Sequence, residues 1–133
     1  MMATANMTAK LNASLDAVWR TVTSLDDFSW RSDLSKIEIL QENKKFIEYS
    51  KEGYKTEFFI TVFLDLKQYE FDMENENMKG HWVGRFFEEE GGTKIDFTET
   101  VDAKKWFIKP FVSSYLKKQQ KQYLTDLKNS VEK

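Results

Sequence analysis

Apolar residues near the end of the chain, over residues 111–131, recur with the spacing of an α-helix. At 3.6 residues per turn they form one continuous stripe, while lysines, glutamines and hydroxyl-bearing residues fall on the opposite side. Pro110 suits the first turn of this helix, where a missing N–H costs nothing. The stripe consists of Val112, Leu116, Tyr123 and Leu127, flanked by Leu124 and Val131. Such a helix needs a concave apolar partner, which we expect the preceding strands to provide.

The first thirty residues predict one strand followed by two short helices. Residues 3–11 are small and alternate with polar residues, which favours a short first strand. Asn12 or Ser14 can cap the next element, in which four apolar residues share one helical face. Those four residues are Leu15, Val18, Trp19 and Val22. Residues 26–30 then predict a turn and a second short helix that returns two aromatic rings to the core.

Further along the chain, the hydrophobic period changes from 3.6 to 2, which predicts strands. Residues 35–49 form two of them, joined by a polar turn at residues 42–44, and Gly53 marks the next turn. The run over residues 54–66 is apolar on both faces and contains the stretch FFITVFL at residues 58–64. Such a stretch at an open sheet edge would promote aggregation, so we place this strand inside the sheet.

Three more strands follow before the final helix. The first alternates apolar side chains with acidic ones over residues 69–74. The second, over residues 78–88, alternates glycines with aromatic rings, which lets a sheet curve and leaves room beside the rings. One face of this strand holds Gly80, Trp82, Gly84 and Phe86. A glycine turn at residues 91–92 leads to the last strand, residues 93–101. One face of this last strand holds Ile95, Phe97, Glu99 and Val101. The predicted order is a strand, two short helices, six strands in a meander and a long helix.

The composition limits what this chain can do. At 133 residues we expect a single domain over residues 1–133, large enough for a core without disulfides. The net charge is −2, from 20 basic and 22 acidic residues, so no overall field favours nucleic acid or an anionic membrane. Cysteine is absent and histidine occurs once, which removes thiolate chemistry and most histidine metal sites. Aromatic residues make up 15% of the chain, enough to line a roomy interior.

The sequence predicts no membrane-spanning or secretory segment. The longest apolar run, residues 58–64, is far shorter than the about 20 residues that cross a bilayer. The N-terminus lacks the basic start and apolar stretch of a signal peptide. Phosphate-binding glycine loops and Ser-His-Asp sets are also missing. We therefore expect a cytoplasmic protein with no metal, no cofactor, no nucleic-acid partner and no integral membrane segment.

Five local phrases of the sequence are similar to one known superfamily. They read ASLDAVW, WRSDL, FIEY, NMKGHW and GGTKIDFTE and begin at Ala13, Trp30, Phe46, Asn77 and Gly91. With the predicted order of elements, they resemble the START/Bet v 1-like (SRPBCC) superfamily, and within it the bacterial polyketide cyclase/dehydrase-like group. The resemblance covers nearly the whole chain.

The resemblance implies an α+β helix-grip fold. In that fold a seven-stranded curved antiparallel sheet wraps around a long C-terminal helix, with two short helices after the first strand. It also implies a hydrophobic cavity between the sheet and the helix. Activities on this scaffold include binding of lipids, hormones or polyketides and occasional cyclisation or dehydration, and the fold does not choose among them.

Inward-facing aromatic residues are the main candidates for contacting a ligand. They either fill the core or line the cavity, and burial of each ring contributes about 1.5–3 kcal/mol in either case. A helix laid across a strongly curved sheet leaves space that side chains need not close, and the resemblance favours the cavity. The candidate ligand-binding residues are Trp30, Arg31, Phe58, Ile60, Tyr69, Phe71, Trp82, Phe86, Phe97, Glu99, Tyr115 and Leu116.

Glu99 is the most informative polar candidate, because strand alternation places it on the inward face. An unpaired buried carboxylate is costly, so Glu99 needs a partner or a raised pKa. The partner can be Arg31, Tyr115 or a ligand hydroxyl, and we favour a structural role over a catalytic one. Glu48 poses the same question more weakly. His81 neighbours an inward-facing ring, so we expect it to point outward as a surface residue.

The sequence thus predicts a domain that binds a small hydrophobic or amphipathic molecule, either lipid-like or polyketide/aromatic. Aromatic rings would contact the apolar body of this ligand, while Arg31, Glu48 or Glu99 would orient its polar end. We expect entry between residues 28–30 and the start of the long helix, where residues 106–108 form an apolar lip.

Two alternatives remain open. One is an enzyme of the cyclase/dehydratase kind, with Glu99 or Glu48 as general base on a polyketide-like substrate. The other is a non-catalytic protein-interaction module whose cavity is filled, and which meets a partner through the exposed faces of Phe59 and Phe63. The predicted assembly is a monomer or a homodimer.

Overall fold

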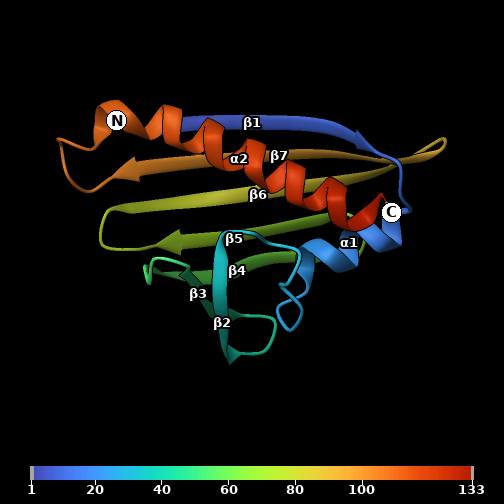
Figure 1. The fold of residues 1–133 in the computed structure, drawn as a ribbon, viewed down its shortest axis with the longest axis horizontal. Helices are drawn as coiled ribbons and strands as arrows, with labels where there is room; N and C mark the ends of the chain where they lie inside the picture. Colours follow the sequence, from blue (N-terminus) through green and yellow to red (C-terminus); the bar gives the residue numbers. More distant parts are fainter. Residues whose placement is uncertain (1, 133) are drawn as a thin grey trace.

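The computed structural model describes residues 2–132, which form a seven-stranded antiparallel sheet and two helices (Figure 1). In chain order the elements are β1 (Met2–Leu11), α1 (Leu15–Thr23), β2 (Leu34–Gln41), β3 (Lys45–Ser50), β4 (Lys55–Leu64), β5 (Gln68–Glu74), β6 (Met78–Glu89), β7 (Gly92–Ala103) and α2 (Lys109–Val131). The predicted meander and the long C-terminal helix are confirmed.

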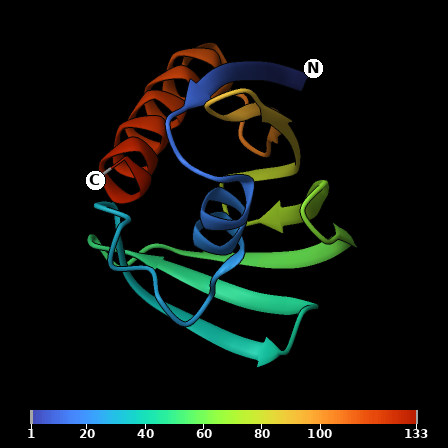
Figure 2. The same ribbon diagram turned by 90° about the vertical axis from the view of Figure 1, so that its right-hand side faces the viewer.

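The strands pair in the order β1-β7-β6-β5-β4-β3-β2, so β1 joins β7 and the others follow one another along the chain. All of these neighbours are antiparallel. Figure 2 shows that the sheet curves away from α2 as it proceeds from β1 to β2. This is the helix-grip arrangement that the sequence resemblance implies.

The helix α1 forms where the sequence predicts it. Ser14 is its N-cap, and Ser14 Oγ accepts a hydrogen bond from the backbone N–H of Ala17 at 3.1 Å. This bond satisfies one of the free donors of the first turn. The helix buries Val18, Trp19 and Val22, which share its apolar face. It therefore closes one end of the curved sheet.

The second short helix predicted over residues 26–30 is wrong, because residues 24–33 form turns and bends instead. Short polar side chains explain the difference. Ser24 Oγ accepts a hydrogen bond from the backbone N–H of Asp27 at 3.2 Å. Asp27 Oδ1 in turn accepts one from the backbone N–H of Ser29 at 3.2 Å. Such bonds satisfy backbone donors locally and compete with helix formation.

The helix α2 lies along one side of the sheet and packs against β1, β7 and α1. Its buried residues include Val112, Leu116 and Leu127, all members of the predicted stripe. Pro110 lies in its first turn, as predicted. Within residues 2–132, no comparable packing joins α2 to β3, β4 or β5. The helix is therefore held over the β1–β7 side, while the opposite side of the sheet curves away.

A bulge in β4 changes which faces its aromatic rings use. The pairing of β4 with β5 shifts register between Ile60 and Val62. Before the bulge, Phe59 is 45% exposed; after it, Phe63 packs edge-on against Trp19 with ring centroids 5.4 Å apart. Phe63 is also 43% exposed, so both rings expose a face as the protein-interaction alternative expects, but the extra residue places them on opposite faces of the sheet.

Gly84 leaves room for the ring of Trp82 on the inner face of the sheet. A Cβ at Gly84 would overlap the far edge of the Trp82 indole and press on Phe97. The absence of a side chain lets the indole fold back over its own strand. The predicted alternation of glycine and aromatic residues in β6 therefore packs Trp82 into the core with 8% of its surface exposed.

Candidate functional site

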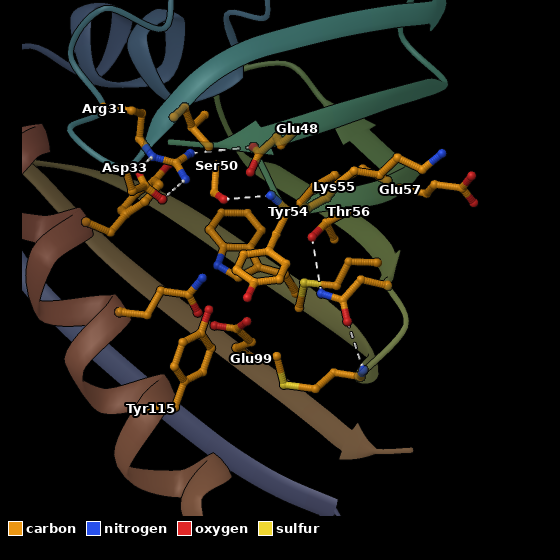
Figure 3. Close-up of a pocket in the computed structure, with 18 of the residues that line it drawn as sticks. Arg31, Asp33, Glu48, Ser50, Tyr54, Lys55, Thr56, Glu57, Glu99 and Tyr115 are labelled. Carbon is orange, nitrogen blue, oxygen red and sulfur yellow. Dashed lines mark hydrogen bonds and ion pairs between the residues drawn. The ribbon is translucent and has the colours of Figure 1, made fainter. Parts of the chain in front are cut away.

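A cavity of about 1450 Å³ lies between α2 and the curved inner face of the sheet (Figure 3). Its walls come from the inner strand faces, the loop before β2, the β3–β4 turn and residues 111–123 of α2. The space exists because α2 packs on β1 and β7 while β3, β4 and β5 curve away. Ligand cavities usually measure about 300–1,000 Å³, so this one has room for a small molecule.

The wall of the cavity opposite α2 is aromatic. Phe46 stacks on Phe58 with ring centroids 4.8 Å apart, and Phe71 stacks on Trp82 at the same distance. Phe58 meets Phe71 edge-on at 5.1 Å, which joins the two stacks. Stacked and edge-on contacts of this kind favour fixed ring positions. The wall therefore presents a continuous apolar surface to the interior.

The structure brings eight of the twelve predicted ligand-binding residues to the cavity. These eight are Arg31, Phe58, Tyr69, Phe71, Trp82, Phe97, Glu99 and Tyr115. It places the other four, Trp30, Ile60, Phe86 and Leu116, outside the cavity lining. Contact of the eight with a ligand stays a prediction.

Packing against neighbouring elements explains why four candidates lie elsewhere. Phe86 packs edge-on against Trp19 of α1 at 4.9 Å. Leu116 is 1% exposed within the apolar cluster that joins α2 to β1 and β7. Trp30 packs edge-on against a tyrosine of α2 at 5.2 Å, and Ile60 packs against the cluster beneath α1. Alternation identified the inner face of the sheet but not which part of that face α1 and α2 cover.

The sequence did not identify many of the other lining residues, among them Phe46, Tyr54, Met73 and Phe111. Phe46 and Met73 carried a usable signal, since each shares a strand face with a predicted cavity residue. Tyr54 and Phe111 are 63% and 69% exposed and lie at the rim, where the cavity meets solvent. Their role depends on how the β3–β4 turn and α2 are placed, which local sequence does not reveal.

The apolar lip predicted at residues 106–108 forms only in part. Ile108 lines the cavity together with Phe28 from the loop before β2. Trp106 and Phe107 do not line it, and they are 80% and 55% exposed. The predicted entrance, between this loop and the start of α2, thus has apolar residues on both sides.

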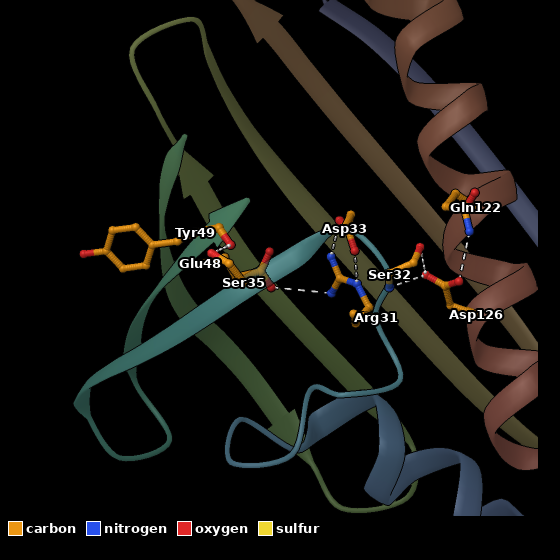
Figure 4. A network of polar contacts seen from close by, with 8 residues as sticks. All are labelled: Arg31, Ser32, Asp33, Ser35, Glu48, Tyr49, Gln122 and Asp126. Carbon is orange, nitrogen blue, oxygen red and sulfur yellow. Dashed lines mark hydrogen bonds and ion pairs between the residues drawn. The ribbon is translucent and has the colours of Figure 1, made fainter. Parts of the chain in front are cut away.

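Arg31 is the central charge of a polar network on one wall of the cavity (Figure 4). Its Nε and Nη2 donate to the two carboxylate oxygens of Asp33, both at 2.9 Å. Its Nη1 lies 3.6 Å from Glu48 Oε2, and the guanidinium lies over the Tyr123 ring, 5.0 Å from the centroid. Burial works to lower the pKa of Arg31, but the carboxylates of Glu48 and Asp33 outweigh it and raise the pKa.

The loop that carries Arg31 is tied to α2 by a buried carboxylate. Asp126 Oδ2 accepts hydrogen bonds from the backbone N–H of Ser32 at 2.9 Å and from Ser32 Oγ at 2.8 Å. Asp126 Oδ1 accepts a third from Gln122 Nε2 at 2.9 Å. Figure 4 shows these bonds joining the loop before β2 to the helix. The position of Arg31 is therefore fixed from both the sheet and the helix.

Glu99 lies on β7 opposite Ala5 of β1 and Trp82 of β6, and its side chain faces the cavity. The residue is 7% exposed, which confirms the predicted inward orientation. Within the described part of the chain, no hydrogen bond or ion pair reaches its carboxylate. Figure 3 shows Tyr115 extending from α2 toward it. Arg31 is not its partner, because Asp33 and Glu48 occupy the guanidinium.

The environment of Glu99 favours its neutral form. Burial raises the pKa of Glu99 to about 7, the nearby carboxylate of Glu48 adds to the rise, and Arg31 partly opposes it. Burial also raises the pKa of Glu48, against the opposing charge of Arg31. Two carboxyl groups with raised pKa values therefore line one cavity, where proton exchange or hydrogen bonding with a bound molecule is chemically possible.

His81 lies on the outer face of the sheet, away from the cavity, as predicted. Its Nδ1 is 2.6 Å from Asp72 Oδ1 and its Nε2 is 2.8 Å from Glu70 Oε1. Burial works to lower the pKa of His81, but the two carboxylates outweigh it and raise the pKa. Across residues 2–132, acidic and histidine side chains form no group of three suited to a metal ion. The helices of this part of the chain are too short or too polar to cross a bilayer.

Solved structures with this fold share little sequence with the chain. A START superfamily protein from Mycobacterium smegmatis superimposes with a TM-score of 0.87 at 12% identity, covering 97% of each chain. A protein from Geobacillus kaustophilus gives a TM-score of 0.81 at 10% identity, over 95% of this chain and 93% of that one. The protein Ara h 8.0201 gives 0.73 at 14% identity, over 97% of each chain. At these identities the similarity establishes the fold alone.

Sequence comparison identifies the family more directly. No curated protein matches the chain. A family model described as "Polyketide cyclase / dehydrase and lipid transport" matches residues 2–132. The match spans every strand and both helices, including the residues that build the cavity. The chain therefore belongs to this polyketide cyclase/dehydrase and lipid transport family.

Proposed function

We propose that this protein binds a small hydrophobic or amphipathic molecule, lipid-like or polyketide/aromatic, in the cavity beneath α2. The observation that carries the proposal is a space of about 1450 Å³ with an aromatic wall and a few polar groups gathered at defined places. An apolar cavity with a small number of convergent polar groups is typical of small-molecule sites. The family match supports the same class of function.

Burial of the ligand's apolar body would provide most of the affinity. Each Å² of apolar surface removed from water contributes about 25 cal/mol, so 200 Å² contributes about 5 kcal/mol before the cost of association. The rings of Phe58, Phe71 and Trp82 would make these contacts. Because these rings already stack on one another, ligand binding would cost little additional side-chain conformational entropy.

The polar groups would fix the orientation of the ligand. Arg31 with Asp33 and Glu48 lies on the sheet side of the cavity, and Glu99 with Tyr115 lies on the side of β7 and α2. A few fixed polar groups within an apolar site select orientation more than they add affinity. A ligand with one polar end would therefore bind in one direction.

Titration with N-phenyl-1-naphthylamine, a neutral apolar fluorophore, tests the proposal. We expect saturable binding with one probe per chain, and its loss in Gln119→Trp, which would place an indole in the cavity from α2. Ser114→Trp is the matched control, because Ser114 is exposed on the same helix and does not line the cavity. Absence of saturable binding to the unmodified protein, or equal loss in both variants, would contradict the proposal.

An enzyme of the cyclase/dehydratase kind is the second candidate, and one observation favours it. A general base works best when its pKa is close to the working pH, and the pKa of Glu99 is raised to about 7. Glu99 or Glu48 would then take a proton from a polyketide-like substrate held in the cavity. In this case Glu99→Gln would abolish turnover and leave substrate binding within a few-fold, whereas a binding protein would show no turnover to lose.

The third reading, a protein-interaction module with a filled cavity, has less support. It requires aromatic side chains that close the space beneath α2, and a volume of about 1450 Å³ counts against such closure. Phe59 and Phe63, the exposed rings on which it also relies, lie on opposite faces of the sheet and so do not form one surface.

A further inference from the structure

The cavity sets one guanidinium against three carboxylates. The groups are Arg31 with Asp33, Glu48 and Glu99. The donors of Arg31 are already committed, two to Asp33 at 2.9 Å and one directed at Glu48 at 3.6 Å. A ligand carboxylate or phosphate entering the cavity would therefore compete with two resident carboxylates for the same cation. These four groups therefore comprise more acidic than basic side chains.

Two acceptors in the cavity lack partners. The carboxylate of Glu99 receives no hydrogen bond within residues 2–132, although the residue is more than nine-tenths buried. Gln119, which also lines the cavity, has a buried Oε1 without a partner in the same part of the chain. Buried polar atoms in native proteins are nearly always hydrogen-bonded, so Gln119 Oε1 is an exception. The Glu99 carboxylate faces the cavity, so a molecule bound there is the available donor for it. The buried Nε1 of Trp30 also lacks a partner, but Trp30 does not line the cavity.

Other polar groups of the cavity do not reverse this preference. The hydroxyls of Tyr69, Tyr115 and Tyr123 can either donate or accept, so they suit ligands of both kinds. Four lysines line the cavity only at its solvent-facing rim, where four glutamates accompany them. The rim is therefore close to neutral, and the charge that a deeply bound ligand meets is that of the buried groups.

We propose that the ligand's polar end is a hydrogen-bond donor, and preferably a protonated amine, which binds the Glu99 carboxylate. This inference rests on the proposed ligand-binding function and specifies the chemical class of the ligand: an apolar body that carries an amine. An ammonium group leaving water needs a buried carboxylate as compensation, and Glu99 is the carboxylate that has no other partner. An apolar molecule ending in a carboxylate would leave two negative groups facing each other.

A matched series of probes tests this inference directly. Decylamine, decanol and decanoate share one apolar chain and differ only in the head group. Each would displace N-phenyl-1-naphthylamine from the protein at pH 8, below the concentration at which it forms micelles. We expect decylamine to bind most tightly and decanoate to bind at least tenfold more weakly than decylamine.

The pH dependence gives a second readout that needs no variant. The charged groups facing Glu99 are Glu48 from β3 and Arg31 from the loop before β2, with the Tyr115 hydroxyl approaching from α2. Decylamine stays protonated and decanoate stays ionised between pH 6 and 8. As Glu99 ionises over this range, the affinity for decylamine should rise about tenfold and that for decanoate should fall.

Glu99→Gln should remove both pH slopes and reduce the difference between amine and carboxylate. Glu42→Gln is the control, because Glu42 is exposed in the β2–β3 turn and does not line the cavity. Equal or tighter binding of decanoate at pH 8, pH slopes that persist in Glu99→Gln, or failure of decylamine to displace a bound fluorophore would overturn the inference and leave the binding function standing. Failure of the fluorophore itself to bind would instead overturn the proposed function on which the inference rests.

Discussion

Carboxylates on the two faces of the sheet differ in whether they have hydrogen-bond partners. On the outer face, Glu70 and Asp72 of β5 flank His81 of β6 at 2.8 and 2.6 Å. On the inner face, Glu99 pairs in register with Trp82, the residue next to His81, and has no hydrogen bond within the described residues. His81 lowers the pKa of Glu70, whereas burial raises the pKa of Glu99 to about 7.

The difference separates groups that stabilise the fold from one that does not. The outer carboxylates have a partner and contact with water, so stability explains their presence. The inner carboxylate loses hydration without gaining a partner, which costs folding free energy. A ligand that donates a hydrogen bond to Glu99 would offset this cost in the bound state. The inner face is therefore where function should be sought.

Removal of a ring from each face should give the largest contrast. Phe97 is 1% exposed in the core, so Phe97→Ala should lower the free energy of unfolding by about 3–5 kcal/mol. Phe59 is 45% exposed on the outer face, and Phe59→Ala should cost about 1 kcal/mol or less. Urea unfolding at pH 7 measures both. Equal losses would show that the inner face is not the packed side.

Replacing the unpaired inner carboxylate should stabilise the protein at alkaline pH. The folded pKa of Glu99 is raised to about 7 from an ordinary 4.5, so the folded state binds more protons between these values. The contribution of Glu99 to the free energy of unfolding is therefore greatest below pH 4.5. It falls as the pH rises through 7, by about 3 kcal/mol in all. Glu99→Gln should unfold at higher urea than the unmodified protein at pH 8.5, with little difference at pH 4.5. A variant that is less stable at pH 8.5 would contradict the unpaired state of Glu99.

The same chemical change at a paired carboxylate should have the opposite sign. Asp126 is 7% exposed, like Glu99, but accepts three hydrogen bonds, two from Ser32 and one from Gln122. Asp126→Asn replaces one acceptor oxygen with a donor and should destabilise the fold by about 1–2 kcal/mol at pH 7. Thermal unfolding in parallel with Glu99→Gln measures the contrast. Stabilisation by both substitutions would mean that burial alone, and not pairing, decides the effect.

The outer cluster should give the smallest effect and the strongest dependence on salt. The pKa of His81 is raised by Asp72 and Glu70, so its contribution is present below pH 6.5 and is lost as pH rises through the raised pKa. Its side chain is 38% exposed, so His81→Gln should cost only about 0.5 kcal/mol at pH 6. Unfolding at 0.05 and 1 M NaCl should show this difference shrinking. An effect that salt does not change would place the cluster in a drier environment than the structure indicates.

Periodicity was sufficient to predict the inner face of the sheet and the stripe of α2. The alternation in β7 placed Phe97 and Glu99 inward, and both are buried. Gly84 was predicted to make room for a ring, and Trp82 occupies that room. These features depend on a strand's two-residue repeat and on the absence of a Cβ, both of which can be read locally.

Features that depend on non-local packing or on one extra residue were not predictable. The bulge after Ile60 reversed the faces on which the later residues of β4 lie. Hydrogen bonds from backbone N–H groups to hydroxyl and carboxyl side chains favoured turns where a second helix was predicted. Arg31 was a candidate partner for Glu99, but its Nε and Nη2 donate to Asp33, two residues further along the chain. The same reason separates Phe86 from the cavity, since α1 covers it. Sequence patterns identify faces, whereas the cavity is set by where helices lie on them.

The ionisation of Glu99 is the property on which the comparison of the two faces depends. A ¹³C NMR titration of its carboxyl carbon, with and without bound decylamine, would measure it directly. We expect a midpoint near pH 7 in the free protein, as burial requires, and a midpoint at least one unit lower when the amine is bound. A midpoint near 4.5 that the amine does not move would show that Glu99 is hydrated or paired and would contradict this description of the cavity.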